Sequence, residues 1–335
     1  MITMPPEWSP HAATWMGYPR AAYPGTGIHD DEARNAWSAV ANAISEHELL
    51  HMLVHPEDQR HAEKTLAGAI ARHEAIIDDA WLRDSGPTFV LDAQLLTAID
   101  WTFNGWGDHT AFAWDCDDAV ASQIADWSGA RHIRSTLVNE GGGIHVNGQG
   151  QVLLTETVQR DPHRNPNWSR EDIETEIHAR LGTHEAIWLP RGLYRDYLDH
   201  GTRGHVDIVA CFTPASSTVL LHQQLNSDHP DWPLFDELAV TLKDSGLDVL
   251  PVPAPTTLRD HRDWVDYSYI NHYVLNGAVI MPSFNDPHDD RAREILTEVY
   301  PGRAIIPIDA RVLFALGGGV HCITQQQPAS ESVII

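Results

Sequence analysis

The sequence predicts an α/β protein in which pairs of short strands alternate with single helices around a centre. Tight turns join the strands of a pair, most clearly at Asn276-Gly277, and segments with helical spacing separate the pairs. This alternation recurs about five times, which indicates a repeat architecture although the sequence contains no clean repeat. A doubly wound parallel sheet would not need so many hairpins.

The spacing of apolar residues places the elements along the chain. Residues 30–45 predict a helix because Ala33, Trp37 and Ile44 share one face. Ser169 and Asp172 match a capping box, with Asp in place of Glu, at the start of another helix. The predicted helices cover residues 30–45, 57–71, 117–125, 169–181, 233–244 and 289–299. The predicted strands cover residues 49–54, 75–77, 88–91, 95–101, 133–138, 143–146, 151–155, 186–189, 205–212, 218–222, 247–251, 270–275, 278–281 and 304–308.

The distribution of proline and glycine argues for one unit. No linker of low complexity divides the 335 residues, and both residue types are spread along the chain as turn punctuation. The length alone would allow two domains or one large α/β unit. We therefore expect a single domain that spans residues 1–335.

The charge balance restricts the partners. The chain has 22 Lys and Arg against 47 Asp and Glu, which gives a net charge of −25. Nucleic acids and anionic membranes are disfavoured because both attract basic patches. The acidic surface suits a cationic substrate, although acidity also serves solubility. The first residues do not resemble a signal peptide, and no apolar run reaches the ~18–20 residues of a membrane span, so we expect a cytoplasmic protein.

The cysteines favour a reactive thiol over a structural disulfide framework. Their odd number, 3, and irregular spacing argue against a disulfide framework or a cysteine-rich zinc site. Cys322 lies shortly after three glycines at residues 317–319, which leave the backbone open to close approach by a ligand. The alternative is a small buried cysteine after a glycine-rich turn, because free cysteine is often buried.

Several other polar residues also adjoin glycines at predicted strand ends. A cysteine nucleophile needs a histidine to move protons, and His205 could supply one. A guanidinium is gripped best by paired carboxylates, which Asp84 and Asp207 could provide. Trp81 offers a π face for a cation, and Glu140 could orient the histidine.

Each of these residues also has a purely structural interpretation. Asp84 could pair with Arg83 or cap a turn, and Trp81 could belong to the core. His205 could be a buried histidine with satisfied hydrogen bonds, and Glu140 could be a turn residue. These interpretations explain less well why the acids and the histidine all adjoin glycines.

Ordered motifs along almost the whole chain resemble the agmatine deiminase family. This family is related to the bacterial peptidylarginine deiminases within the guanidine-modifying pentein superfamily. The motifs are Met4-Pro5-Pro6-Glu7-Trp8, Trp15-Met16 and residues 81–87, 100–107, 140–145, 165–166, 188–193, 204–207 and 317–328. The resemblance implies a five-bladed, pseudo-symmetric α/β propeller with its active site at the centre.

The resemblance also implies roles for the candidate residues. Cys322 would be the nucleophile and His205 the general acid and base, supported by Glu140. Asp84 and Asp207 would clamp the guanidinium. Trp81 would line the pocket.

The expected reaction is the hydrolysis of a small guanidino compound, with agmatine giving N-carbamoylputrescine and ammonia through a thiouronium on the cysteine. No metal or organic cofactor is implied, and a homo-oligomer is compatible with the resemblance. The alternatives are a deiminase of an arginine-like substrate, an amidinotransferase, and a protein that only binds guanidino ligands. Release of ammonia distinguishes both deiminases from the last two, and transfer to an added amine identifies the amidinotransferase.

Three departures from the family pattern concern the rest of the substrate. Arg203 and Ile208 flank Gly-His-Val-Asp where the family usually has an acidic or amide residue and an asparagine, and Asp108-His109 replaces a usual glycine. Arg203 would repel the ammonium of agmatine and attract a substrate carboxylate, so we include it among the substrate-binding candidates. The alternative is that Arg203 faces solvent and pairs with Asp196 or Asp199.

Overall fold

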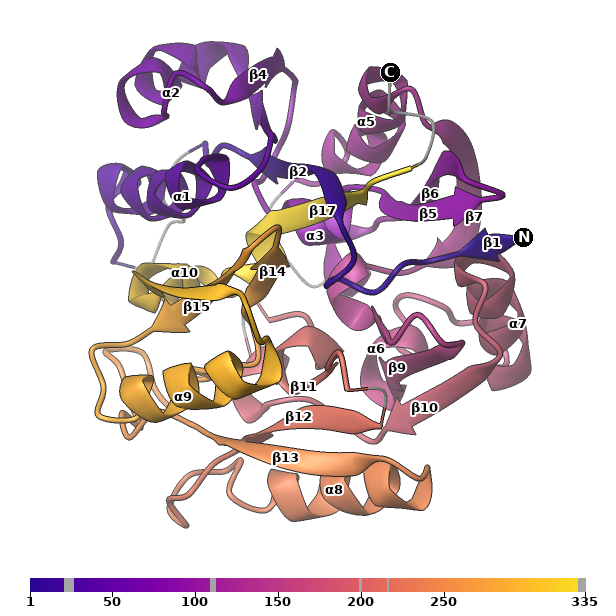
Figure 1. The fold of residues 1–335 in the computed structure, drawn as a ribbon, viewed down its shortest axis with the longest axis vertical. Coiled ribbons are helices and arrows are strands. Elements are labelled where there is room, and N and C mark those ends of the chain that lie inside the picture. The colour runs from indigo at the N-terminus through magenta and orange to yellow at the C-terminus, as the bar shows by residue number, and fades with distance from the viewer. Residues whose placement is uncertain (21–26, 109–112, 199–200, 216, 331–335) are drawn as a thin grey trace.

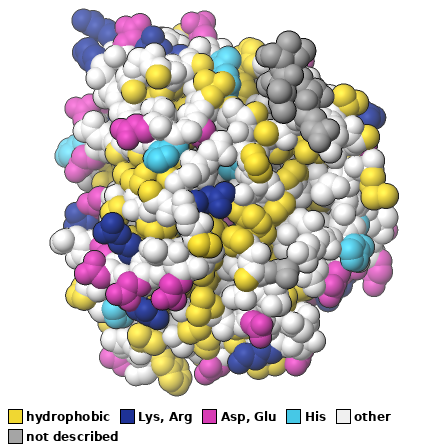
Figure 2. Space-filling view, viewed as in Figure 1, with side chains coloured by type: hydrophobic (Ala, Val, Ile, Leu, Met, Phe, Trp, Pro, Cys, Tyr) yellow, Lys and Arg dark blue, Asp and Glu magenta, His cyan; other side chains and the backbone are white. Residues whose placement is uncertain are grey.

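The computed structural model describes residues 1–20, 27–108, 113–198, 201–215 and 217–330. Within these ranges the strands form five separate sheets, which follow one another around the molecule, with the longer helices on the outside (Figure 1). Figure 2 shows acidic side chains scattered towards the edge of one face and hydrophobic side chains across its middle. No helix within the described ranges is long and apolar enough to cross a membrane.

All five sheets share one pattern, in which an antiparallel pair of strands is followed, after a helix, by a strand parallel to the second of the pair. The first sheet contains β5 (Thr88–Asp92), β6 (Leu95–Thr102), α5 (Val120–Ser128) and β7 (Arg131–Val138), with β1 (Ile2–Thr3) on its edge. The second contains β8 (His145–Val146), β9 (Gln151–Thr155), α6 (Glu156–Gln159), α7 (Arg170–Leu181) and β10 (Glu185–Leu189). The third contains β11 (Ala210–Phe212), β12 (Thr218–Gln223), α8 (Leu234–Asp244) and β13 (Asp248–Pro253).

The last two sheets bring the ends of the chain together. The fourth contains β14 (Tyr273–Leu275), β15 (Ala278–Ser283), α9 (Asp289–Val299) and β16 (Ala304–Asp309), and α10 (Arg311–Leu316) follows it. The fifth contains β17 (Thr324–Pro328), β2 (His11–Gly17), α1 (Asp30–Ser45), β3 (Leu50–Val54), α2 (Gln59–Thr65) and β4 (Ala71–Glu74). Its first strand comes from the end of the chain and its second from the beginning. The ring of sheets is therefore completed by pairing between distant parts of the sequence.

Local sequence explains much of this arrangement. The middle strands are nearly continuous runs of buried apolar residues, such as Val219, Leu220 and Leu221 in β12, because both of their faces are covered. Helix α1 has the predicted bounds and buries Trp37 on its apolar face. The capping box at the start of α7 is also confirmed.

Other predicted elements were wrong in part. The helix predicted over 57–71 ends at Thr65, and Ala71–Glu74 forms an edge strand because it pairs in parallel with β3. Residues 75–77, predicted as a strand, lie after this strand. The strand predicted over 205–212 begins only at Ala210, because Val206–Ile208 forms a 3-10 turn. Tertiary pairing and turn geometry overrode the local pattern in these cases.

Candidate active site

A short turn stands immediately before the first strand of each sheet, and these turns converge near the centre, where α3 and β17 lie in Figure 1. They are α3 (Leu82–Ser85), Gly141–Gly143, Val206–Ile208, residues 269–272 and His321–Ile323. The turns or the residues just before them carry Asp84, Glu140, His205, Asp207, Asn271 and Cys322, and each of these side chains is buried. The repeated fold thus gathers polar residues that lie far apart in the sequence.

Cys322 lies among polar groups from the third and fourth sheets. Its Sγ is 3.3 Å from Asn271 Nδ2 and 3.6 Å from Asp207 Oδ2. Burial raises the pKa of the Cys322 thiol well above its usual value, and the carboxylates of Asp207 and Asp84 raise it further. The cysteine is therefore a thiol, and not a thiolate, in the free protein at neutral pH.

His205 lies between two carboxylates. Its Nε2 is 3.3 Å from Glu140 Oε2, and its Nδ1 is 3.8 Å from Asp84 Oδ2. Burial alone would lower the pKa of His205, but Asp84 and Glu140 outweigh it and raise that pKa to about 9. In the part of the chain that the structure describes, Nδ1 has no hydrogen-bond partner. A Cβ at position 142 would lie 2.5 Å from Nδ1, so only glycine leaves room for this ring.

Glu140 is held by Arg164. The Arg164 Nε donates hydrogen bonds to both Glu140 oxygens, at 2.9 and 3.1 Å, and both side chains are fully buried. Burial would raise the pKa of Glu140, but Arg164 and His205 lower it to about 2. Glu140 thus remains a carboxylate facing His205.

The two aspartates are held in different ways. Asp84 Oδ1 accepts a hydrogen bond from the Gly142 backbone N–H, and Oδ2 accepts one from Trp106 Nε1, each at 2.9 Å. Asp207 Oδ2 lies 2.8 Å from His321 Nδ1 and 3.2 Å from Asn271 Nδ2. Asp207 Oδ1 is buried and has no hydrogen-bond partner among the described residues. It is an acceptor available to a bound cation.

The pKa values of the two aspartates also diverge. Burial raises the pKa of Asp84, and the nearby charges of Asp207 and Glu140 add to this against the opposing effect of His205. Burial would also raise the pKa of Asp207, but the His321 ring lowers it below the usual value. Asp207 is therefore the more firmly ionised of the pair.

Trp81 is both a core residue and a neighbour of Cys322, so it fits both roles considered from the sequence. It is buried, and its ring meets Trp37 edge-on with centroids 5.2 Å apart. A Cβ at position 318 would lie 2.6 Å from the Trp81 ring and 3.2 Å from Cys322 Sγ, so the ring also borders the cysteine. Arg83 does not pair with Asp84 among the described residues, and donates hydrogen bonds to the His321 carbonyl and to Gln326 Oε1.

Among the described residues, the Arg203 side chain pairs with Asp161 and not with Asp196. Its Nε lies 3.3 Å from Asp161 Oδ2, and 38% of its side chain is exposed. The Asp196 carboxylate instead accepts hydrogen bonds from the backbone of Thr202, Gly204 and His205. Asp199 and His109 lie outside the described residues, as does the Asp108 side chain, and Ile208 is buried.

Sequence reasoning missed three site residues, namely Asn271, Trp106 and His321. Trp106 and His321 stand within the quoted motifs but were given no role. Asn271 lies in the turn before the fourth sheet, directly ahead of the strand pair around Asn276-Gly277. The rule that a polar residue precedes the first strand of each sheet would have pointed to it.

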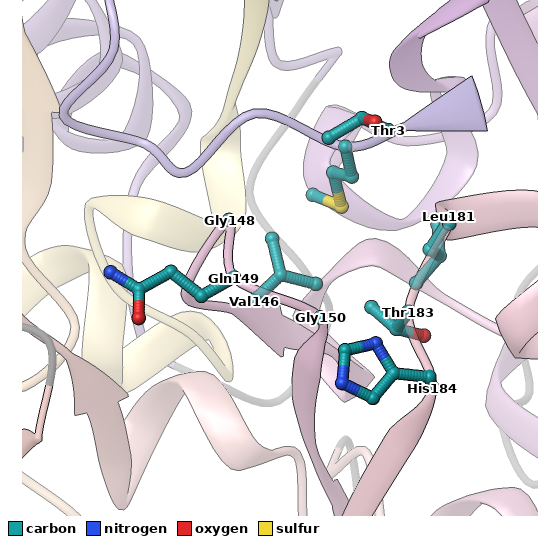
Figure 3. A pocket seen from close by; sticks show the side chains of 10 residues that line it. Thr3, Val146, Gly148, Gln149, Gly150, Leu181, Thr183 and His184 are labelled. Atoms are coloured by element: carbon teal, nitrogen blue, oxygen red, sulfur yellow. The ribbon is translucent and has the colours of Figure 1, made fainter. Parts of the chain in front are cut away.

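A separate cavity of about 290 Å³ lies away from these turns. Figure 3 shows side chains around it, which come from β1, from the turn between β8 and β9, and from the end of α7. Thr3, Gln149, Thr183 and His184 are its lining residues with polar side chains, and none of the site candidates lines it.

Comparisons with known proteins agree with this geometry. A family model described as Porphyromonas-type peptidyl-arginine deiminase matches residues 3–328. A Streptomyces coelicolor protein, provisionally named agmatine deiminase, is 48% identical over 97% of this chain and 98% of its own length. An Ectopseudomonas mendocina agmatine deiminase is 35% identical over 98% of this chain and 96% of its own length.

A solved structure extends the likeness to three dimensions. The agmatine deiminase of Enterococcus faecalis superposes with a TM-score of 0.90 at 30% identity, covering 98% of this chain and 96% of that one. The fold is accordingly the α/β pentein fold, as the sequence predicted.

Proposed function

We propose, given that this chain belongs to the Porphyromonas-type peptidyl-arginine deiminase family, that it hydrolyses agmatine to N-carbamoylputrescine and ammonia. One observation carries the proposal: Asp207, whose Oδ1 has no hydrogen-bond partner in the described part of the chain, places its Oδ2 3.6 Å from the Cys322 sulfur. An acceptor for a guanidinium N–H thus lies next to a nucleophile for its carbon.

In this proposal the guanidinium lies between Asp84 and Asp207, with Trp81 along the pocket wall. The free site holds Cys322 as a thiol and His205 as an imidazolium, because of their raised pKa values. A bound cation beside the sulfur favours the thiolate, so substrate binding promotes release of the thiol proton to solvent, since His205 already carries its own.

The chemistry then follows in two halves. The thiolate attacks the guanidinium carbon, His205 donates its proton to the departing nitrogen, and ammonia leaves a thiouronium on Cys322. The neutral His205 takes a proton from water, whose oxygen attacks the same carbon. Collapse releases the ureido product and restores the thiolate, while Glu140 stabilises the imidazolium in both halves.

The finer architecture is part of the same proposal. We assign the five sheets as five blades of a propeller around this site, because each contributes a turn to it. The residues from 1 to 335 then act as one catalytic domain. The described cysteines form no disulfide, which suits a protein that acts in the reducing cytoplasm.

Product analysis tests the function. Purified protein should release ammonia and N-carbamoylputrescine from agmatine, and mass spectrometry of enzyme quenched during turnover should find an adduct on the Cys322 peptide. The Cys322→Ala variant should lose turnover while keeping its fold. Transfer of the amidino group to an added amine would identify an amidinotransferase instead, and binding without product would identify a sequestering protein.

A parallel assay with arginine tests the substrate. Faster hydrolysis of arginine than of agmatine would contradict the substrate assignment while leaving the reaction class intact.

A further inference from the structure

A carboxylate from the start of the chain contacts the histidine that precedes Cys322. Glu7 lies in the segment between β1 and β2, which runs beside β17 (Figure 1), and its side chain is buried. Its Oε1 is 2.6 Å from His321 Nε2. Glu7 therefore contacts the residue next to the cysteine, although 314 positions separate Glu7 from His321.

The other nitrogen of His321 faces a second carboxylate. His321 Nδ1 is 2.8 Å from Asp207 Oδ2, so carboxylate oxygens meet the ring at both ends. A neutral imidazole has one N–H and one lone pair, whereas the imidazolium donates from both nitrogens. Only the doubly protonated ring satisfies both contacts.

The groups around His321 favour the cation on balance. Arg83 Nη1 lies 3.6 Å from Glu7 Oε1, and His145 Nε2 lies 4.0 Å from Glu7 Oε2. Burial and Arg83 oppose a charge on His321, whereas burial lowers the pKa values of the neighbouring His145 and His272 rings to about 4 and leaves these rings neutral. Glu7 and Asp207 outweigh this opposition, and the pKa of His321 is raised.

The contact with His321 fixes one carboxylate oxygen of Asp207. Its Oδ2 is occupied by His321 and by Asn271, whose amide also meets Cys322 Sγ. Oδ1, for which no described residue is a hydrogen-bond partner, then has one orientation relative to the sulfur. Without the cation, Asp207 would stand near the Asp84 carboxylate with less to keep it ionised.

We propose that Glu7 and His321 are positioning residues of the reaction: Glu7 keeps the His321 ring doubly protonated, and that ring holds Asp207 as a carboxylate whose Oδ1 is presented to the guanidinium. This role rests on the proposed deimination. Glu7 and His321 affect the binding of substrate, whereas His205 transfers the protons.

The Glu7→Gln variant tests the proposal through its pH dependence. The amide keeps the size and an acceptor oxygen but removes the charge, so His321 should lose its second proton at lower pH. We expect kcat/KM for agmatine to fall at least ~10-fold at pH 8, mainly through KM, and to recover towards the wild-type value as the pH is lowered to 6. A wild-type pH profile, or a loss equal at every pH, would overturn the proposal.

A matched control is available in another buried acid that faces a histidine. Asp231 Oδ2 is 3.6 Å from His229 Nδ1, both side chains are almost fully buried, and neither belongs to the central turns. Asp231→Asn should leave kcat/KM and its pH profile unchanged even where it lowers the melting temperature. The same pH-dependent loss in Asp231→Asn would show that any buried acid has this effect.

A measurement without turnover separates this proposal from the proposed function. Nitrogen-15 NMR of histidine-labelled wild-type protein, with His321→Gln identifying the resonance, should show both His321 nitrogens protonated at pH 7. The Glu7→Gln variant should show a neutral ring at pH 8. A neutral ring in the wild type overturns the positioning role even if Glu7→Gln does not fold, whereas wild-type protein that leaves agmatine intact overturns the proposed function alone.

Discussion

Two buried histidines contact residues of the candidate site, and each lies between two carboxylates. His205 is 3.3 Å from Glu140 and 3.8 Å from Asp84, and its Nδ1 has no hydrogen-bond partner within the described ranges. His321 is 2.6 Å from Glu7 and 2.8 Å from Asp207. Both pKa values are raised, so the charge state alone does not distinguish the two rings.

The difference lies in hydrogen-bond saturation. A ring with both N–H groups committed to short contacts holds its protons, whereas a ring with one free nitrogen can pass a proton to a reacting group. The same residue type, equally buried and equally surrounded by acids, is thereby suited to two tasks.

The largest expected effect separates the two histidines. His205→Asn should reduce kcat by ~10²–10⁴-fold, the range of general acid–base catalysis. His321→Asn should act mainly on KM, because it disturbs Asp207 and moves no proton. Steady-state kinetics of both variants on agmatine measure the split. Equal losses of kcat would break the distinction between the rings.

The aspartates are expected to show the next largest effect. Asp84→Asn and Asp207→Asn should each cost ~2–5 kcal/mol in kcat/KM, because each removes a buried charged contact to the substrate. Asp84→Asn should also disturb folding, because both Asp84 oxygens accept hydrogen bonds and an amide nitrogen cannot. Thermal unfolding and kinetics of the two variants measure these effects.

An exposed acid provides the control for the aspartates. Asp309 forms an ion pair with Arg311 at the surface, and Asp309→Asn should leave kcat/KM within threefold of wild type. If both site variants also stay within threefold, the clamp lies elsewhere.

Protein stability should depend on pH through His205. Its folded pKa of about 9 lies above the ordinary unfolded value of ~6.5, so its contribution is complete below ~6.5 and is lost as the pH rises through about 9. The loss is on the order of 3 kcal/mol. Urea unfolding at pH 6.5 and 9.5 should show the wild type losing its advantage over His205→Asn. An advantage that stays constant would contradict a protonated His205.

Arg203 is expected to have the smallest effect. Its ion pair with Asp161, and its exposure, agree with a residue at the rim whose charge is already partly offset. We therefore expect Arg203→Asn to change the ratio of agmatine to arginine efficiencies by less than ~10-fold, which is 1.4 kcal/mol. Kinetics on both substrates measure the ratio. A larger rise in this ratio would mean that Arg203 contacts the end of the substrate farthest from the guanidinium.

Sequence by itself determined the local elements and the chemical types at the site. Helix α9 has the bounds that its apolar spacing predicts, and Asn276-Gly277 joins β14 to β15 with Gly277 at φ 74°. The glycine-rich motifs also identified Cys322, His205 and the two aspartates as candidates. Periodicity and turn residues report the conformation of a few neighbouring positions, which is largely set by local propensity where no distant pairing overrides it.

Only the tertiary structure decided which atoms meet and where the protons lie. The contact between Glu7 and His321 joins the two ends of the chain, and Asn271 enters the site from a turn with no distinctive motif. The edge strand Ala71–Glu74 likewise exists through its pairing with β3. The pKa of a buried group is set by charges within a few ångströms, and these groups become neighbours only when the five sheets assemble.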